Sequence, residues 1–136
     1  EARMSRGETG IPGRGTLCAC GGVFTKMAIL HDGTMVPCNM LPTLTMGVVG
    51  RHSIRDAWLH HPAINGVRQR RRIPLSSLDS CRDCPYTGFC TGGCPASVMS
   101  KFGRLNAIDP LICYRAYTSG GDADPEDRTR KGGRTR

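Results

Sequence analysis

The chain has 136 residues, a formal net charge of +8, only 5% aromatic residues, 18 glycines and 9 prolines. This is enough for one domain, but its apolar core must be small, so we expect metal or sulfur to supply part of the stability. The polar start and the lack of any long apolar run argue against a signal peptide and a membrane span, which predicts a cytoplasmic protein without a membrane partner.

The two ends of the sequence lack apolar periodicity. We expect residues 1–16 to be disordered, or a linker remnant of an upstream domain, and residues 119–136 to be a disordered tail rich in Gly, Arg and Asp. The domain is then predicted over residues 17–118. Its predicted fold class is α+β: a small domain stabilised by metal clusters, with a β-hairpin, short helices and cysteine ligand loops. The lack of an initiating Met suggests a fragment of a longer chain.

The first predicted element is a β-hairpin. Residues 23–30 are typical of a strand, residues 31–33 (His-Asp-Gly) of a turn in which glycine adopts positive φ, and residues 34–37 of the returning strand. Residues 46–49 are a candidate third strand. The hairpin would bring Cys20 and Cys38 together at its open end, because residues that flank an antiparallel pair lie about 5 Å apart.

Two helices are predicted next. Ser53 is a good N-cap for a helix that carries Ile54, Ala57 and Trp58 at helical spacing. Pro62 interrupts it and begins a second helix with Ile64 and Val67 facing inward. On this pattern the arginine run faces outward as a solvated surface; it comprises Arg68, Arg70, Arg71 and Arg72.

The positive charge is weak evidence for a nucleic-acid partner. Four thiolates around a metal centre carry a net charge of about −2, so two filled sites would reduce the net charge to roughly +4. The arginine run also has no aromatic side chains beside it on which bases could stack. We therefore do not expect nucleic acid to bind.

Cysteines dominate the rest of the chain. Residues 79–94 hold too many Cys, Gly and Pro for regular structure and are predicted as a ligand loop, in which Gly92 and Gly93 let the backbone pass close to a metal centre. Pro95 begins a short helix that stops at Gly103. Asp109 then caps a last helix, residues 110–117, that carries Cys113.

Eight cysteines at close spacing in a reducing cytosol indicate metal ligands rather than disulfides. Structural zinc sites use two short C-x2-4-C knuckles for each ion, and only Cys81 and Cys84 form one. The spacing therefore favours iron–sulfur clusters. A zinc-stabilised interaction module with a basic partner-binding face is the alternative. The histidines fall outside the cysteine spacing and are not expected as ligands; they are His31, His52, His60 and His61.

The cysteine spacing resembles the SPASM domain, the C-terminal auxiliary-cluster module of many radical S-adenosylmethionine enzymes. The family pattern opens with C-x9-15-G-x4-C, which Cys20, Gly33 and Cys38 fit. It continues with C-x2-C-x5-C-x3-C and ends with a single cysteine. The residues that fit this second part are Cys81, Cys84, Cys90, Cys94 and Cys113.

The resemblance implies two [4Fe-4S] clusters with crossed ligation. The ligands of the first cluster would be Cys18, Cys20, Cys38 and Cys94. Those of the second would be Cys81, Cys84, Cys90 and Cys113. Both Cys18 and Cys20 suit the opening spacing. If only one of them binds, the first cluster becomes a two-iron cluster or keeps an open iron site.

The resemblance also implies a role in electron transfer and substrate positioning for a radical enzyme that modifies a peptide or protein. The sequence has no C-x3-C-x2-C, the motif that holds the radical-generating cluster in this enzyme class. S-adenosylmethionine is therefore expected only on a separate barrel domain, upstream in the same chain or acting in trans. We expect no catalysis by this chain alone.

Overall fold

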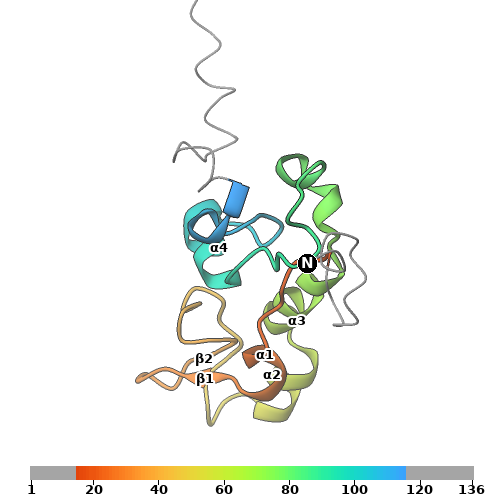
Figure 1. Ribbon diagram of the computed structural model, residues 1–136. Helices are drawn as coiled ribbons and strands as arrows, with labels where there is room; N and C mark the ends of the chain where they lie inside the picture. The colour runs from red at the N-terminus through yellow and green to blue at the C-terminus, as the bar shows by residue number, and fades with distance from the viewer. Residues whose placement is uncertain (1–14, 116–136) are drawn as a thin grey trace, which may run out of the picture.

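The computed structural model describes residues 15–115 (Figure 1). They form a small domain of short helices with one two-stranded antiparallel hairpin, in agreement with the coarse prediction. The helices are α1 (Gly22–Thr25), α2 (Ile54–His60), α3 (Pro62–Gln69) and α4 (Pro95–Phe102), and the strands are β1 (Ala28–Ile29) and β2 (Met35–Val36). Single 3-10 turns are η1 (Arg70–Arg72), η2 (Leu75–Ser77), η3 (Asp79–Cys81) and η4 (Pro110–Ile112). Most of the two segments predicted as disordered lie outside the described residues.

The hairpin turn forms as predicted. Strands β1 and β2 pair in antiparallel register, with Ala28 opposite Val36. Gly33 adopts φ +84°, and the Asp32 carboxylate accepts a hydrogen bond from the Thr34 backbone N–H at 2.9 Å. That bond holds the pKa of Asp32 below its usual range. The third strand is reduced to a single bridge between Thr34 and Val48.

The prediction of a strand over residues 23–30 is wrong in its first half, where α1 forms instead. Val23 lies buried against α3, and the Arg68 Nε of that helix donates to the Val23 carbonyl oxygen at 2.9 Å. The β-branched side chains of this segment favour a strand only weakly, so these contacts with α3 decide the local conformation. The strand itself is confined to β1.

The boundaries of α2 and α3 are as predicted. The Ser53 Oγ accepts from the Asp56 N–H at 3.2 Å and caps α2. His61 is extended between the helices, and its Nδ1 accepts from Ala63 N–H at 3.2 Å to cap α3, which begins at Pro62. The inward positions of α3, Ile64 and Val67, are fully buried.

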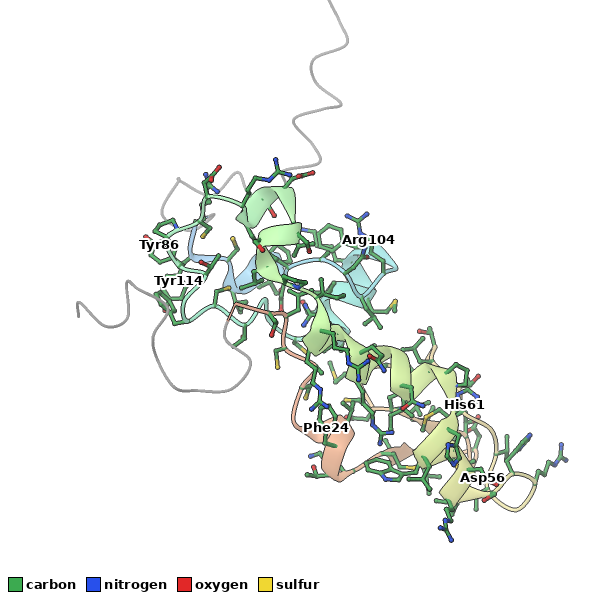
Figure 2. The ribbon with its side chains drawn as sticks, turned by 90° about the vertical axis from the view of Figure 1, so that its right-hand side faces the viewer. Phe24, Asp56, His61, Tyr86, Arg104 and Tyr114 are labelled. Atoms are coloured by element: carbon green, nitrogen blue, oxygen red, sulfur yellow. The ribbon has the colours of Figure 1, made fainter. Side chains whose placement is uncertain are left out.

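Buried apolar side chains gather in two places. The larger group, called here the hairpin core, joins the hairpin, α2, α3 and the start of α4; it consists of Val23, Met35, Leu41, Met46, Ala57, Ile64, Val67 and Ala96. The smaller group, called here the loop core, consists of Leu17, Leu75 and Cys81. Figure 2 shows Asp56 and His61 near one end of the molecule and Tyr86 and Tyr114 at the other.

The outward-facing arginine run is a wrong prediction. Arg70 is 1% exposed, and Arg68 is half-buried with its guanidinium stacked on the Trp58 ring, 4.4 Å from the ring centroid. Only Arg71 and Arg72 are exposed. The helical period of α3 breaks at η1, so a pattern extrapolated along one helix places Arg70 on the wrong side.

The C-terminal part matches the prediction except at its end. Helix α4 begins at Pro95 and stops at Gly103, which adopts φ +65°. The loop of residues 79–94 contains only the turn η3 as a named element. Asp109 caps the single turn η4 rather than a helix, and Cys113 follows in extended conformation. Tyr114 and Arg115 are helical again, and residues 116 and 117 of the predicted helix lie outside the described residues.

Candidate metal centres

All eight cysteines lie within the described residues, and all are free thiols. This agrees with the prediction that they are not disulfide-bonded. They fall into two neighbourhoods, one beside the hairpin core and one beside the loop core. Each neighbourhood draws its cysteines from segments that are far apart in the sequence.

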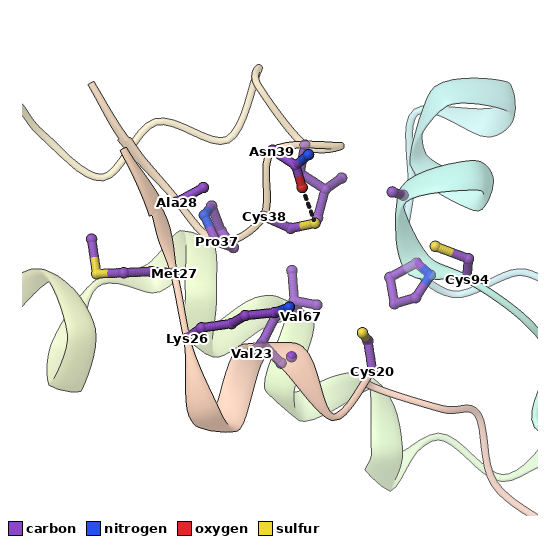
Figure 3. A pocket seen from close by; sticks show the side chains of 14 residues that line it. Cys20, Val23, Lys26, Met27, Ala28, Pro37, Cys38, Asn39, Val67 and Cys94 are labelled. Carbon is purple, nitrogen blue, oxygen red and sulfur yellow. Dashed lines mark hydrogen bonds between the residues drawn. The ribbon is translucent and has the colours of Figure 1, made fainter. Parts of the chain in front are cut away.

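The first cysteine group consists of Cys20, Cys38 and Cys94, which line one pocket of about 270 Å³. Figure 3 shows the three side chains around this pocket, from the segment before α1, the end of β2 and the start of α4. The other lining side chains are mainly apolar and include Val23 and Val67. The tertiary structure thus brings together three cysteines separated by up to 74 positions, since 94 − 20 = 74.

Cys20 owes its place to an unusual backbone conformation. Its φ of +67° is the only positive value at a non-glycine position in residues 15–115. Strain of this kind is found where surrounding structure over-determines a functional position. Cys20 and Cys38 do meet, as predicted, but α1 lies between Cys20 and β1, so strand pairing alone does not explain it.

Cys18 stands apart from the first cysteine group. It is not among the residues that line the pocket. Its Sγ accepts a hydrogen bond from the Cys20 backbone N–H at 3.0 Å. Cys18 is therefore next to the group without sharing its cavity.

Polar groups surround the other two thiols of the first group. The Cys38 Sγ accepts from the Met40 N–H at 3.4 Å and donates to the Asn39 Oδ1 at 3.4 Å. Cys94 is exposed and is the N-cap of α4.

The second cysteine group consists of Cys81, Cys84, Cys90 and Cys113. Cys81 is 4% exposed, and burial raises the pKa of its thiol. The Ser80 hydroxyl lowers that pKa, while the negative charges of the other three cysteines raise it. The four thiols therefore act on one another electrostatically, and a cation placed among them would relieve the repulsion.

Three aromatic rings join the segments of the second group. Tyr86, Phe89 and Tyr114 contact one another with centroid separations of 5.6 to 5.8 Å. Tyr114 directly follows Cys113, and the Arg115 Nη1 donates to the Ser80 carbonyl oxygen at 3.2 Å. These contacts hold the end of the described chain against the loop of residues 79–94.

Two glycines lie in the short backbone segment that links the second cysteine group to the first. Gly92 and Gly93 adopt φ of +69° and +77°. A Cβ at Gly92 would clash with Leu17, and one at Gly93 would clash with Asp109. Close packing against other parts of the protein therefore requires glycine at both positions. The Gly92 N–H also donates to the Cys90 Sγ at 3.4 Å.

Arg70 belongs to this site although sequence analysis did not identify it. Its guanidinium donates to five backbone carbonyl oxygens, those of Cys18, Gly92, Gly93, Leu105 and Ala107. Burial lowers the pKa of Arg70, whereas the charges of Cys18, Cys94 and Asp109 raise it. An arginine in a basic run is most often exposed, so nothing in the residue pattern could have identified it.

A single metal ion and an iron–sulfur cluster require different spacings of their cysteine ligands. Within residues 15–115, no three His, Cys, Asp or Glu side chains form a group that could hold one metal ion. With Zn–S bonds of about 2.3 Å, a tetrahedral zinc site needs its sulfurs roughly 3.8 Å apart. An iron–sulfur cluster places an inorganic core between its ligands, so its cysteines stand farther apart. Backbone N–H groups that point at sulfur, as at Cys38 and Cys90, are also typical of cluster sites.

Two of the four histidines serve as local hydrogen-bond partners. The His52 Nδ1 accepts from the Val48 N–H at 3.0 Å, and His61 caps α3.

None of the helices in the described part of the chain has the length and apolar character needed to cross a membrane.

Comparison with known proteins identifies the kind of domain. Residues 18–85 match the SPASM family, an iron–sulfur cluster-binding domain. The PqqA peptide cyclase of Methylocella silvestris is 32% identical over 101 residues, 71% of this chain and 26% of the relative. The PqqA peptide cyclase of Ruegeria pomeroyi is 28% identical over 102 residues, 73% of this chain and 26% of the relative. The chain thus spans about a quarter of the length of these curated relatives. No solved structure matches the chain significantly.

Proposed function

The chain belongs to the SPASM family of iron–sulfur cluster-binding domains, and from this premise we propose that it holds two [4Fe-4S] clusters. The clusters would serve electron transfer and substrate positioning in an enzyme that modifies a peptide or protein. The observation that carries the proposal is the separation of the cysteines into two neighbourhoods: one holds three of the four ligands that the resemblance implies for the first cluster, and the other holds the four that it implies for the second.

The first cluster is assigned to the first cysteine group with Cys18, and the second cluster to the second cysteine group. Support for the first assignment is the shared pocket of Cys20, Cys38 and Cys94. Support for the second is the electrostatic influence of three of its cysteines on the fourth. Cys90 and Cys94 go to different clusters, so a short stretch of backbone with Gly92 and Gly93 would fix the separation of the two centres.

Of Cys18 and Cys20, the two cysteines that suit the first position of the family pattern, Cys20 is the better candidate for a direct ligand. It lines the pocket with its backbone in a strained conformation, whereas Cys18 lies outside the lining. If Cys18 does not bind, the first cluster has three cysteine ligands and an open iron site, or is a two-iron cluster. The apolar lining beside Cys20 and Cys38 would shield that site from water.

The catalytic reaction would take place on another domain. This sequence has no C-x3-C-x2-C, so we propose that a radical S-adenosylmethionine barrel domain, in the same chain or in trans, generates the radical. The similar proteins carry the name PqqA peptide cyclase, which supports a peptide as substrate. When bound, the clusters would accept or donate single electrons. The cysteine groups hold them at a fixed separation.

The zinc-stabilised interaction module loses support. Its basic partner-binding face depended on four outward arginines, and Arg70 is buried while Arg68 is bonded within the fold.

Anaerobic reconstitution of the full natural protein, followed by iron, sulfide and zinc analysis, tests the proposal. Any cluster on a further domain is first removed by serine substitution of its own ligands, so that only this domain is counted. We expect about eight iron and about eight sulfide ions per chain for two four-iron clusters, with a broad absorption band at about 400 nm. About two zinc without sulfide would contradict the cluster proposal.

Two single variants serve as controls for each other. Cys38→Ser is expected to remove the first cluster and Cys81→Ser the second, so each keeps about half of the iron. Equal loss of all iron in both variants would contradict two separate sites. Cys18→Ser is then compared with Cys20→Ser: full iron content in the first and loss in the second would show that Cys20 is the ligand.

A further inference from the structure

The Arg70 side chain makes a set of hydrogen bonds that none of the described helices and strands needs for its own formation. It is the first residue of η1, and its side chain is buried under the segments that carry the cysteines. An arginine side chain has five N–H donors. All five are used: Nε donates to Leu105 at 2.8 Å, Nη1 to Cys18 and Gly93, and Nη2 to Gly92 and Ala107.

Every acceptor is a backbone carbonyl oxygen, and the acceptors come from three separate segments. One belongs to Cys18, beside the pocket of the first cysteine group. Two belong to Gly92 and Gly93, between Cys90 and Cys94. Two belong to the loop that follows α4. The guanidinium therefore fixes the backbone on two sides of the first cluster site, at Cys18 and just before Cys94.

Within residues 15–115, no carboxylate lies at ion-pair distance from Arg70. The Asp109 carboxylate accepts from Ser97 and from the Leu111 N–H instead. A buried cation needs a compensating negative charge. The thiols of Cys18 and Cys94 are the ionisable groups whose charges favour the charged form of Arg70 most, and a cluster with four thiolates would carry about −2.

We propose that Arg70 is a positioning residue that holds the Cys18 and Cys94 segments around the first cluster, and that its positive charge makes this cluster easier to reduce. The inference rests on the proposed function. A positive charge nearby stabilises the more negative, reduced state, so it raises the reduction potential. Arg70 would thus set the order in which the two clusters accept electrons.

The test compares three variants of the full natural protein. Arg70→Gln removes the charge and most donors, Arg70→Lys keeps the charge but has three donors, and Arg72→Gln removes an exposed charge from the same turn. Iron release to a chelator and the reduction potential of each cluster are measured. Both readouts differ from activity and from unfolding.

We expect half of this domain's iron to leave Arg70→Lys and Arg70→Gln at least about tenfold faster than wild type, with Arg72→Gln unchanged. We also expect reduction of one cluster to become about tenfold less favourable in Arg70→Gln, about 59 mV for one electron, and to change by less than about twofold in Arg70→Lys. Should Arg70→Gln fail to assemble, the release rate from Arg70→Lys decides.

Release rates equal to that of Arg72→Gln would overturn the positioning role. Equal potentials in Arg70→Gln and Arg70→Lys would overturn the role of the charge, because a merely structural residue alters stability without moving the potential. A wild-type domain that binds no iron and sulfide would instead contradict the proposed function itself.

Discussion

The two ends of this domain are held together by different means. The hairpin core contains eight buried residues, whereas the loop core contains three, of which Cys81 is one. Apolar burial contributes about 25 cal/mol for each Å² removed from water, so it stabilises the hairpin end far more than the loop end. The loop end relies instead on polar contacts such as those of Arg70, and on whatever its thiols bind.

The two cysteine groups differ in the same way in their surroundings. The first cysteine group lies at the edge of the hairpin core, and its pocket has walls that apolar packing builds without metal. Three cysteines of the second group lie in the loop of residues 79–94, whose only named element is η3, and the fourth, Cys113, follows the single turn η4. A metal centre there would supply folding energy as well as chemistry. We therefore expect perturbations at the two ends to differ in kind.

Removal of metal should have the largest effect, and it should be confined to the loop end. After chelation, amides of residues 79–93 are expected to lose hydrogen-exchange protection by more than about a hundredfold, equivalent to about 2.8 kcal/mol. The amides of Met35 and Val36 should lose much less, because the hairpin core remains. Hydrogen exchange with mass spectrometry before and after chelation checks this. Equal loss at both ends would contradict the comparison.

Ile64→Ala should produce the complementary effect at the hairpin end. Ile64 is fully buried in the hairpin core, and truncation of such a side chain leaves a cavity that costs about 2–5 kcal/mol. Denaturant unfolding of the metal-loaded protein measures the loss. The control is Ile54→Ala in α2, which is 48% exposed and should change stability by less than about 1 kcal/mol. Similar losses in both variants would argue against a packed core here.

Gly93→Ala and Gly50→Ala separate backbone strain from close packing. Both glycines have positive φ, so alanine costs about 1–2 kcal/mol at either position. At Gly50 a Cβ meets no other atom, whereas at Gly93 it would clash with Asp109 and Ile112. We expect a total of about 2–4 kcal/mol at Gly93, with loss of iron. Matched unfolding midpoints for the two variants would rule out the packing argument.

Ser53→Ala should have the smallest effect. The Ser53 hydroxyl caps α2 at the hairpin end, and loss of an N-cap costs about 1 kcal/mol. Ser100→Ala, at an exposed position of α4, is the matched control. The thermal midpoint should fall for Ser53→Ala alone, without change in iron content. A fall in iron content would show that the two ends are coupled more strongly than their packing indicates.

Local features of the fold could be predicted from the sequence because each depends on neighbouring residues. The turn at Gly33, the cap at Ser53, and the start and stop of α4 follow from glycine conformation, side-chain acceptors and the fixed φ of proline. The spacing of the eight cysteines likewise predicts that they act as ligands, and within the described residues all eight are free thiols.

Other features depend on what lies against a residue in space. Residues 22–25 form α1 rather than a strand because α3 packs over Val23, and Arg70 is buried because five carbonyl groups of distant segments converge on it. Cys20 rather than Cys18 lines the pocket because the chain turns through positive φ at Cys20. The sequence by itself determined which residues carry the chemistry, through their types and spacing. Only the tertiary structure decided which of these residues lie together, because long-range packing and the burial of charge depend on contacts between segments that are far apart in the sequence.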